Sequence, residues 1–180
     1  MAAIKPEYIF FWGAQEKPYG VFSQWHSSKF TANQEIYEIF NKNIYNANLK
    51  NKIFDNCEQY MMACKALLFE DITVFNKIIA SQDPKKIKSL GRQVKNFDQT
   101  IWGLHKYKIV VNCNFLKFSQ DKNLKDILMS TQNKIIVEAS PLDNIWGIGF
   151  KAADALANIN KWGENLLGLA LVEVREKLRK

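Results

Sequence analysis

Two residues that could do chemistry stand seven positions apart in one apolar stretch of this 180-residue chain. Glu58 could give and take a proton, and Lys65 could serve as a cation or as a nucleophilic amine. Seven positions are nearly two helical turns, so on a helix both side chains project from nearly the same side. Such a pair is either a buried ion pair or the working groups of a pocket, because burying either group alone is costly.

A helix over residues 55–69 is expected to carry both groups. Asp55 followed by Glu58 three positions later is a capping-box type of start. The remaining residues, with Tyr60 among them, are apolar on nearly every side. This pattern predicts a helix buried inside the fold.

Residues 21–26 mix aromatic with hydrogen-bonding side chains and are expected to form a loop or a short strand. Phe22 and Trp25 could stack on a planar ring, while Ser23 and Gln24 could bind its edge. The alternative is that the two aromatic residues belong only to the core.

The remaining elements are assigned from periodicity, caps and turn residues. Residues 32–54 are polar and are expected to form a surface excursion with a short helix over 35–40. Strands are predicted over 8–12 and 134–140, and helices over 71–80, 83–91, 98–118 and 164–178. A shorter helix is expected to end at Met129, with Asn123 or Asp121 as its cap.

Two loops carry further candidates for a site. Arg92 follows a glycine that is predicted to close a helix, and an arginine there is well placed to clamp a phosphate. Asp143 stands on the loop that leaves the second strand. Trp146 and Gly147 follow it, and the glycine would let a ligand or a backbone approach closely.

Charge and composition narrow the classes of protein. The net charge of +7 favours a phosphorylated or polyanionic ligand, although a merely solvated surface is the plainer interpretation. Only three of the basic residues are arginine, which argues against a dense arginine-based nucleic-acid interface. Three cysteines without metal-type spacing and two histidines predict no metal site and no cofactor.

No stretch is apolar for long enough to cross a membrane, and the first residues lack the layout of a signal peptide. The expectation is a monomer of the cytoplasm, with the nucleus as the alternative. The cysteines are expected to be reduced core residues.

Several separated motifs, taken together, resemble the YbiA-like proteins of the NADAR (NAD- and ADP-ribose-associated) superfamily over about residues 9–178. The stretch from about 35 to 54 departs from the pattern as an insertion, and it could alter the rim of the pocket. The motifs that carry the resemblance are Phe22-Ser-Gln-Trp25, Glu58-Gln-Tyr-Met-Met-Ala-Cys-Lys65, Gly91-Arg-Gln-Val94, Trp102, Asn114-Phe-Leu-Lys-Phe-Ser-Gln120 and Glu138-Ala-Ser-Pro-Leu-Asp143-Asn-Ile-Trp-Gly-Ile-Gly149.

The resemblance implies one domain over residues 1–180, with an α+β, mostly α fold and a few short strands. It also implies an N-glycosidase that acts on N-ribosyl bonds. The expected substrate is ADP-ribosylated guanine in nucleic acid or a nucleotide, and the alternative is a phosphorylated intermediate of riboflavin biosynthesis. Catalysis is assigned to Lys65, Glu58 and Asp143. Substrate binding is assigned to Phe22, Ser23, Gln24, Trp25, Tyr60, Arg92, Trp102, Lys117, Trp146 and Gly147.

The residue types suit that chemistry. Glu58 would act as the acid/base group, and Asp143 would position the ribose or steady positive charge at its C1. Aromatic walls would lower the pKa of Lys65, leaving a neutral amine able to form a Schiff base with C1. Alternatively Lys65 stays charged and pairs with Glu58 or a phosphate. Two other classes stay open, a binding module without hydrolysis and a purely structural ion pair.

Overall fold

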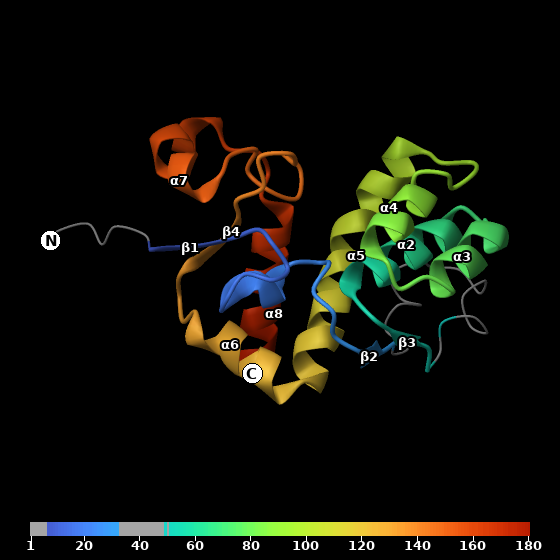
Figure 1. The fold of residues 1–180 in the computed structure, drawn as a ribbon, viewed down its shortest axis with the longest axis horizontal. Coiled ribbons are helices and arrows are strands. Elements are labelled where there is room, and N and C mark those ends of the chain that lie inside the picture. Colours follow the sequence, from blue (N-terminus) through green and yellow to red (C-terminus); the bar gives the residue numbers. More distant parts are fainter. Residues whose placement is uncertain (1–6, 33–48, 50) are drawn as a thin grey trace, which may run out of the picture. The chain divides into compact units, whose positions relative to one another are not determined.

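The computed structural model describes residues 7–32, 49 and 51–180. The predicted helix over 35–40 and most of the predicted 35–54 insertion therefore lie outside the described residues. Helices dominate, with a few short strands (Figure 1), which confirms the predicted α+β, mostly α class. The chain divides into two compact units, and each is described by itself. Unit 1 comprises the residues up to Ser23 together with 121–180, and unit 2 comprises residues 24–120.

Unit 2 is a group of helices around one buried helix, α2. Contacts join α2 to α3, α4 and α5, which surround it (Figure 1). A short antiparallel pair, β2 with β3, lies beside the helices. The elements are β2 (Phe30–Thr31), β3 (Ile53–Phe54), α2 (Cys57–Leu68), α3 (Ile72–Ile79), α4 (Pro84–Gly91) and α5 (Gln99–Gln120).

Helix α2 starts one residue later than the sequence pattern predicts. Asn56 is the N-cap, and its side chain accepts a hydrogen bond from the backbone nitrogen of Gln59 at 2.9 Å. Gln59 reaches back in turn, and its Oε1 accepts from the backbone nitrogen of Asp55 at 2.9 Å. The predicted cap by Asp55 is therefore wrong, because Asn56 caps the helix and Gln59 returns its hydrogen bond to Asp55, the residue before the cap.

Gly91, predicted to close a helix, is the last residue of α4, and its packing explains the residue type. A Cβ on Gly91 would overlap the thioether of Met62 on α2. A side chain there would therefore push α4 away from α2 or displace Met62. Gly103 on α5 is the opposite case, because an added Cβ would meet nothing within 4 Å.

These two glycines give a matched pair of stability predictions. Gly103→Ala should raise the free energy of unfolding by about 0.5–1 kcal/mol, because it restricts the unfolded chain and favours a helix. Gly91→Ala should lower it by about 1–3 kcal/mol through overpacking against Met62. Urea unfolding of the two variants measures both changes, and shifts of the same sign would contradict this account.

Unit 1 is built on a parallel pair of strands. β1 (Tyr8–Phe11) pairs with β4 (Ile135–Glu138) in a register that sets Tyr8 against Ile135. Around them lie η1 (Tyr19–Phe22), α6 (Lys122–Ser130), α7 (Ala152–Ala155), η3 (Leu156–Lys161) and α8 (Leu166–Arg179). The segment predicted as a loop or short strand over 21–26 thus begins in the last turn of η1.

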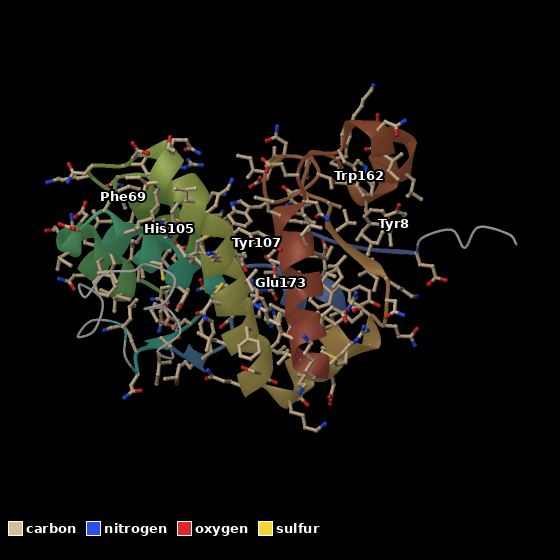
Figure 2. The ribbon with its side chains drawn as sticks, turned by 180° about the vertical axis from the view of Figure 1, so that it is seen from behind. Tyr8, Phe69, His105, Tyr107, Trp162 and Glu173 are labelled. Carbon is tan, nitrogen blue, oxygen red and sulfur yellow. The ribbon has the colours of Figure 1, made fainter. Side chains whose placement is uncertain are left out.

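An aromatic contact covers part of the core of unit 1. The rings of Tyr8 and Trp162 meet edge to face with centroids 5.5 Å apart (Figure 2). They cover a buried cluster that includes Val137 and Ile148.

Helix α8 starts at Leu166 instead of the predicted Glu164, because the side chain of Asn165 binds the backbone of β4. Asn165 has a left-handed backbone with φ of 52°. Its side-chain oxygen accepts from the backbone nitrogen of Glu138 at 3.0 Å, and its amide donates to the carbonyl of Ile136 at 3.0 Å. The start of α8 is therefore attached to β4.

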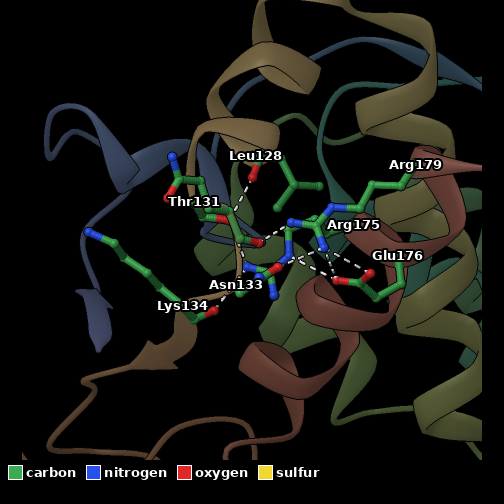
Figure 3. A network of polar contacts seen from close by, with 8 residues as sticks. Leu128, Thr131, Asn133, Lys134, Arg175, Glu176 and Arg179 are labelled. Carbon is green, nitrogen blue, oxygen red and sulfur yellow. Dashed lines mark hydrogen bonds and ion pairs between the residues drawn. The ribbon is translucent and has the colours of Figure 1, made fainter. Parts of the chain in front are cut away.

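Arg175, in the C-terminal half of α8, binds the segment between α6 and β4 (Figure 3). This arginine is 2% exposed, and its Nη1 donates to the Thr131 hydroxyl at 2.8 Å and to the Lys134 carbonyl at 2.9 Å. Glu176 accepts from Arg175 at 3.2 Å and from Arg179 at 2.9 Å. The buried charge is thus matched by hydrogen-bond acceptors, as a buried guanidinium requires.

Candidate active site

The acid of the predicted pair lies at the start of α2. Glu58 is 4% exposed, and its Oε2 accepts a hydrogen bond from the indole nitrogen of Trp25 at 3.3 Å. Its backbone nitrogen donates to the carbonyl of Gln24 at 3.0 Å. Residues 24 and 25 therefore hold both the backbone and the carboxylate of Glu58.

The amine of Lys65 lies one turn before the end of the same helix, and Lys65 is the only residue of α2 that is not buried. Its Nζ donates to the carbonyl of Gly91 at 2.8 Å. The same nitrogen is 4.1 Å from the ring centroid of Phe97 and 5.7 Å from that of Trp102. Phe69, labelled in Figure 2, packs edge to face on Phe97 with centroids 5.3 Å apart. The amine therefore sits in an aromatic setting.

That setting changes the acidity of Lys65 in the predicted direction. Burial lowers the pKa of its ammonium, and the positive charge of Arg92 lowers it further. A lowered pKa means that more of the amine is neutral at any pH below the ordinary value. The neutral form is the nucleophile.

The structural ion pair between Glu58 and Lys65 is wrong as an interpretation. Lys65 has no acidic partner among residues 7–32, 49 and 51–180, because its Nζ is directed to the Gly91 carbonyl and to aromatic rings. The two groups share a helix without pairing. That the two residues are the working groups of a site stays a prediction.

The end of α4 lies beside both groups. Nζ of Lys88 is 5.9 Å from the ring centroid of Trp25, the residue that binds Glu58. Three positions later, Gly91 binds Lys65. Arg92 is the C-cap of α4 and is exposed. Within unit 2 the structure therefore brings together Glu58, Lys65, Trp25, Trp102 and Arg92, all of them predicted.

Sequence reasoning missed Phe97, Lys88 and the Gly91 carbonyl. Phe97 is isolated among polar residues, so no periodicity points to it. Lys88 and Arg92 are four apart, and they lie on one face because the helical backbone continues into Arg92, one residue beyond the predicted helix. That was an available signal, whereas the use of a backbone carbonyl leaves none.

Asp143, Trp146 and Gly147 belong to unit 1. Oδ1 of Asp143 accepts from the backbone nitrogens of Ile145 at 2.9 Å and Trp146 at 2.8 Å, so this carboxylate shapes its own loop. A Cβ on Gly147 would lie 2.7 Å from the carbonyl oxygen of Glu138, and a backbone therefore approaches this glycine closely. A direct part for these three residues in a reaction stays a prediction.

The other expected binding residues are buried. Phe22 packs on Phe11 with ring centroids 5.5 Å apart, and Ser23 is 7% exposed. The Tyr60 hydroxyl donates to Oδ1 of Asn112 at 2.6 Å. Lys117 is 1% exposed, and burial lowers the pKa of its ammonium despite an opposing effect of nearby cysteines. Contact of these four residues with a substrate stays a prediction.

The three cysteines are free thiols in the core, as expected. Across the described ranges, no group of three His, Cys, Asp or Glu side chains could hold a metal ion. No helix in the same ranges combines the length and the apolar character needed to cross a membrane.

Comparisons with known proteins agree with the family suggested by the motifs. The NADAR domain family matches residues 10–179. N-glycosidase R617 of Acanthamoeba polyphaga mimivirus is 47% identical over 179 residues, covering 95% of this chain and 96% of the relative. An N-glycosidase of Nostoc punctiforme is 31% identical over 122 residues, covering 68% of this chain and 72% of the relative. The chain therefore belongs to the NADAR family.

A solved structure shares the fold. The Escherichia coli protein YbiA matches with a TM-score of 0.73 and 22% sequence identity, covering 98% of this chain and 88% of that chain. The YbiA-like fold expected from the sequence is confirmed.

The acidity of Lys65 can be measured on the free protein. In competitive acetylation with acetic anhydride, Lys65 should reach half of its full reactivity at a lower pH than the exposed Lys77, because only a neutral amine reacts. Arg92→Ala should move the Lys65 midpoint upward by removing a repelling charge, and Arg179→Ala, the control, should not. Mass spectrometry of each labelled lysine gives the midpoints. Equal midpoints for Lys65 and Lys77 would refute the assignment.

Two substitutions separate the loop-shaping role of Asp143 from its charge. Asp143→Asn keeps the Oδ1 acceptor but removes the negative charge, whereas Asp143→Ala removes both. If the charge takes part in the reaction, both variants should lose turnover, by roughly a hundredfold or more, and Asp143→Asn should keep its melting temperature. An active Asp143→Asn together with a destabilised Asp143→Ala would show that Asp143 shapes its loop and takes no part in the reaction.

Proposed function

We propose that this protein hydrolyses the N-ribosyl bond of ADP-ribosylated guanine, carried by nucleic acid or by a nucleotide. The coarser part of the proposal, an N-glycosidase of the NADAR family, is supported by the names of two relatives. The finer part, the guanine substrate, is supported by the net charge of +7, which attracts nucleic acid and other polyphosphates.

The observation that carries the proposal is the setting of Lys65. Its amine is half-buried between Phe97 and Trp102, without an acidic partner among the described residues, and its pKa is lowered. A lysine that served only in a structural ion pair would need an acidic neighbour. This setting suits a neutral amine that attacks carbon.

The reaction balances with two groups of α2. Glu58, in its acid form, gives a proton to the departing base nitrogen while the C1–N bond breaks. Nζ of Lys65 bonds to C1, the ribose ring opens, and one amine proton passes to the ring oxygen. The products are the free base, a protonated imine between C1 and Lys65, and the Glu58 carboxylate.

Water then completes the cycle. Its oxygen adds to C1 and its two protons go to Nζ, which releases the sugar aldehyde and leaves a lysine ammonium. The ammonium returns one proton to Glu58. The Trp25 indole, which donates to Oε2 of Glu58, stabilises the carboxylate formed in the first step.

A phosphate of the substrate would bind beside these groups. Lys88 and Arg92 stand four residues apart at the end of α4, and neither has an acidic partner in the part of the chain that the structure describes. Two uncompensated cations beside aromatic rings attract an anion with a planar group attached. ADP-ribosylated guanine has both.

The test uses two substrates and three variants. Purified protein is incubated with ADP-ribosylated guanine in DNA and, separately, with an aminopyrimidine ribose phosphate of riboflavin biosynthesis, and the released base is measured. Lys65→Ala and Glu58→Gln should lower turnover by roughly 10²–10⁴-fold. Lys77→Ala, the control on α3, should not. Glu58→Gln still offers Trp25 an acceptor, so its loss reports on the proton.

Sodium borohydride should trap the wild-type protein covalently on the substrate, with the adduct mapped to Lys65 and absent from Lys65→Ala. Turnover without an adduct would leave Lys65 as a charged binding residue. Release from the aminopyrimidine alone would transfer the proposal to riboflavin intermediates. Binding without release from either substrate would identify a reader of ADP-ribose instead of an enzyme.

A further inference from the structure

A buried amide on α5 faces the segment that holds Glu58. Asn114 is fully buried, and every polar atom of its side chain is used. Nδ2 donates to Oε1 of Gln24 at 3.0 Å and to the carbonyl of Val110 at 2.9 Å. Oδ1 accepts from the Cys57 thiol at 3.9 Å.

This pattern fixes the direction of the amide. Gln24 and Val110 both present acceptor oxygens, so only the NH₂ group of Asn114 can face them. The reversed amide would set oxygen against oxygen in a buried place and leave polar groups without a hydrogen bond, which is unfavourable. Asn114 is therefore a rigid donor aimed at Gln24.

Gln24 connects Asn114 to Glu58. Its side chain is held on the inner side by Asn114, with a weaker contact from Nε2 to the Cys113 sulfur at 3.9 Å. Its carbonyl accepts from the Glu58 backbone nitrogen at 3.0 Å, which satisfies an amide of the first turn of α2. The next residue, Trp25, donates to the Glu58 carboxylate.

We infer that Asn114 is a positioning residue for the acid of the site, acting through Gln24 to hold the Trp25 indole against the carboxylate of Glu58. The side chain of Gln24 is hydrogen-bonded to Asn114, and its expected contact with the edge of a substrate ring stays a prediction. The inference rests on the proposed function only for its effect on turnover. The placement of Trp25 can be measured without any substrate.

Asn112 provides a matched control on the same helix. It is also buried, at 7% exposed, and its Oδ1 accepts from the Tyr60 hydroxyl at 2.6 Å. Asn112→Ala therefore removes a buried amide and its hydrogen bonds from α5, as Asn114→Ala does. Of the two variants, Asn114→Ala is the one that removes the contact with Gln24.

The first measurement is the indole N–H signal of Trp25 in proton–nitrogen correlation spectra, assigned by its absence in Trp25→Phe. In Asn114→Ala its hydrogen exchange with solvent should speed up by about tenfold or more, since the hydrogen bond to Glu58 is no longer held. In Asn112→Ala the exchange should stay within about twofold of the wild type. Unchanged exchange in Asn114→Ala, or an equal change in both variants, would overturn the inference.

The second measurement is steady-state turnover of whichever substrate the wild type cleaves. Asn114→Ala should lower kcat by about tenfold or more while KM changes by less than about threefold, because the acid and not the binding surface is disturbed. If the wild type cleaves nothing, the proposed function fails and the indole signal still decides the inference. Gln24→Met removes the same contact from the other side. It should reproduce the exchange result if Asn114→Ala does not fold, and a protected Trp25 indole in Gln24→Met would count against the inference.

Discussion

Eleven of the twelve residues of α2 are buried, and yet this helix carries a carboxylate and an amine seven residues apart. Neither group could be taken from water without compensation, and they do not compensate each other. The carboxylate of Glu58 accepts a hydrogen bond from the Trp25 indole, and the amine of Lys65 donates one to the Gly91 carbonyl. The neighbouring segments therefore supply one hydrogen-bond partner to each of these two groups. The missing side chain at Gly91 lets α4 come close enough to meet one of them.

Most of the fold could be predicted from local signals. Asp71 and Asp83 cap α3 and α4 as their sequence positions indicate, since a short acceptor side chain before an apolar run has few other uses. Of the two caps expected for α6, Asn123 or Asp121, the structure uses Asp121. The start of α2 was missed by one residue because Asp55 and Asn56 are both good caps, and only Gln59 decides between them. The start of α8 was missed because Asn165 binds a distant strand, which no local pattern reveals.

The candidate site was predictable in part, for a physical reason. Glu58 and Lys65 stand out because charged residues are rare in an apolar helix. Trp25 and Arg92 were reached through residue type and resemblance. Phe97 was not, because a single exposed ring in a polar loop gains its meaning from what the chain folds against it. The same is true of the Gly91 carbonyl and of Asn114, whose functions lie in hydrogen bonds between segments far apart in the sequence.

The attachment of Asn165 to β4 also bears on how the protein behaves at high concentration. β4 pairs with β1 along one side, and its other side would present the backbone of Ile136 and Glu138 to any passing chain. The Asn165 amide occupies two of those groups, and the backbone of Ile148 takes the Glu138 carbonyl. A strand whose outer edge is already occupied cannot serve as a template for a third strand. The β4 edge of this two-stranded sheet is therefore protected from edge-to-edge aggregation.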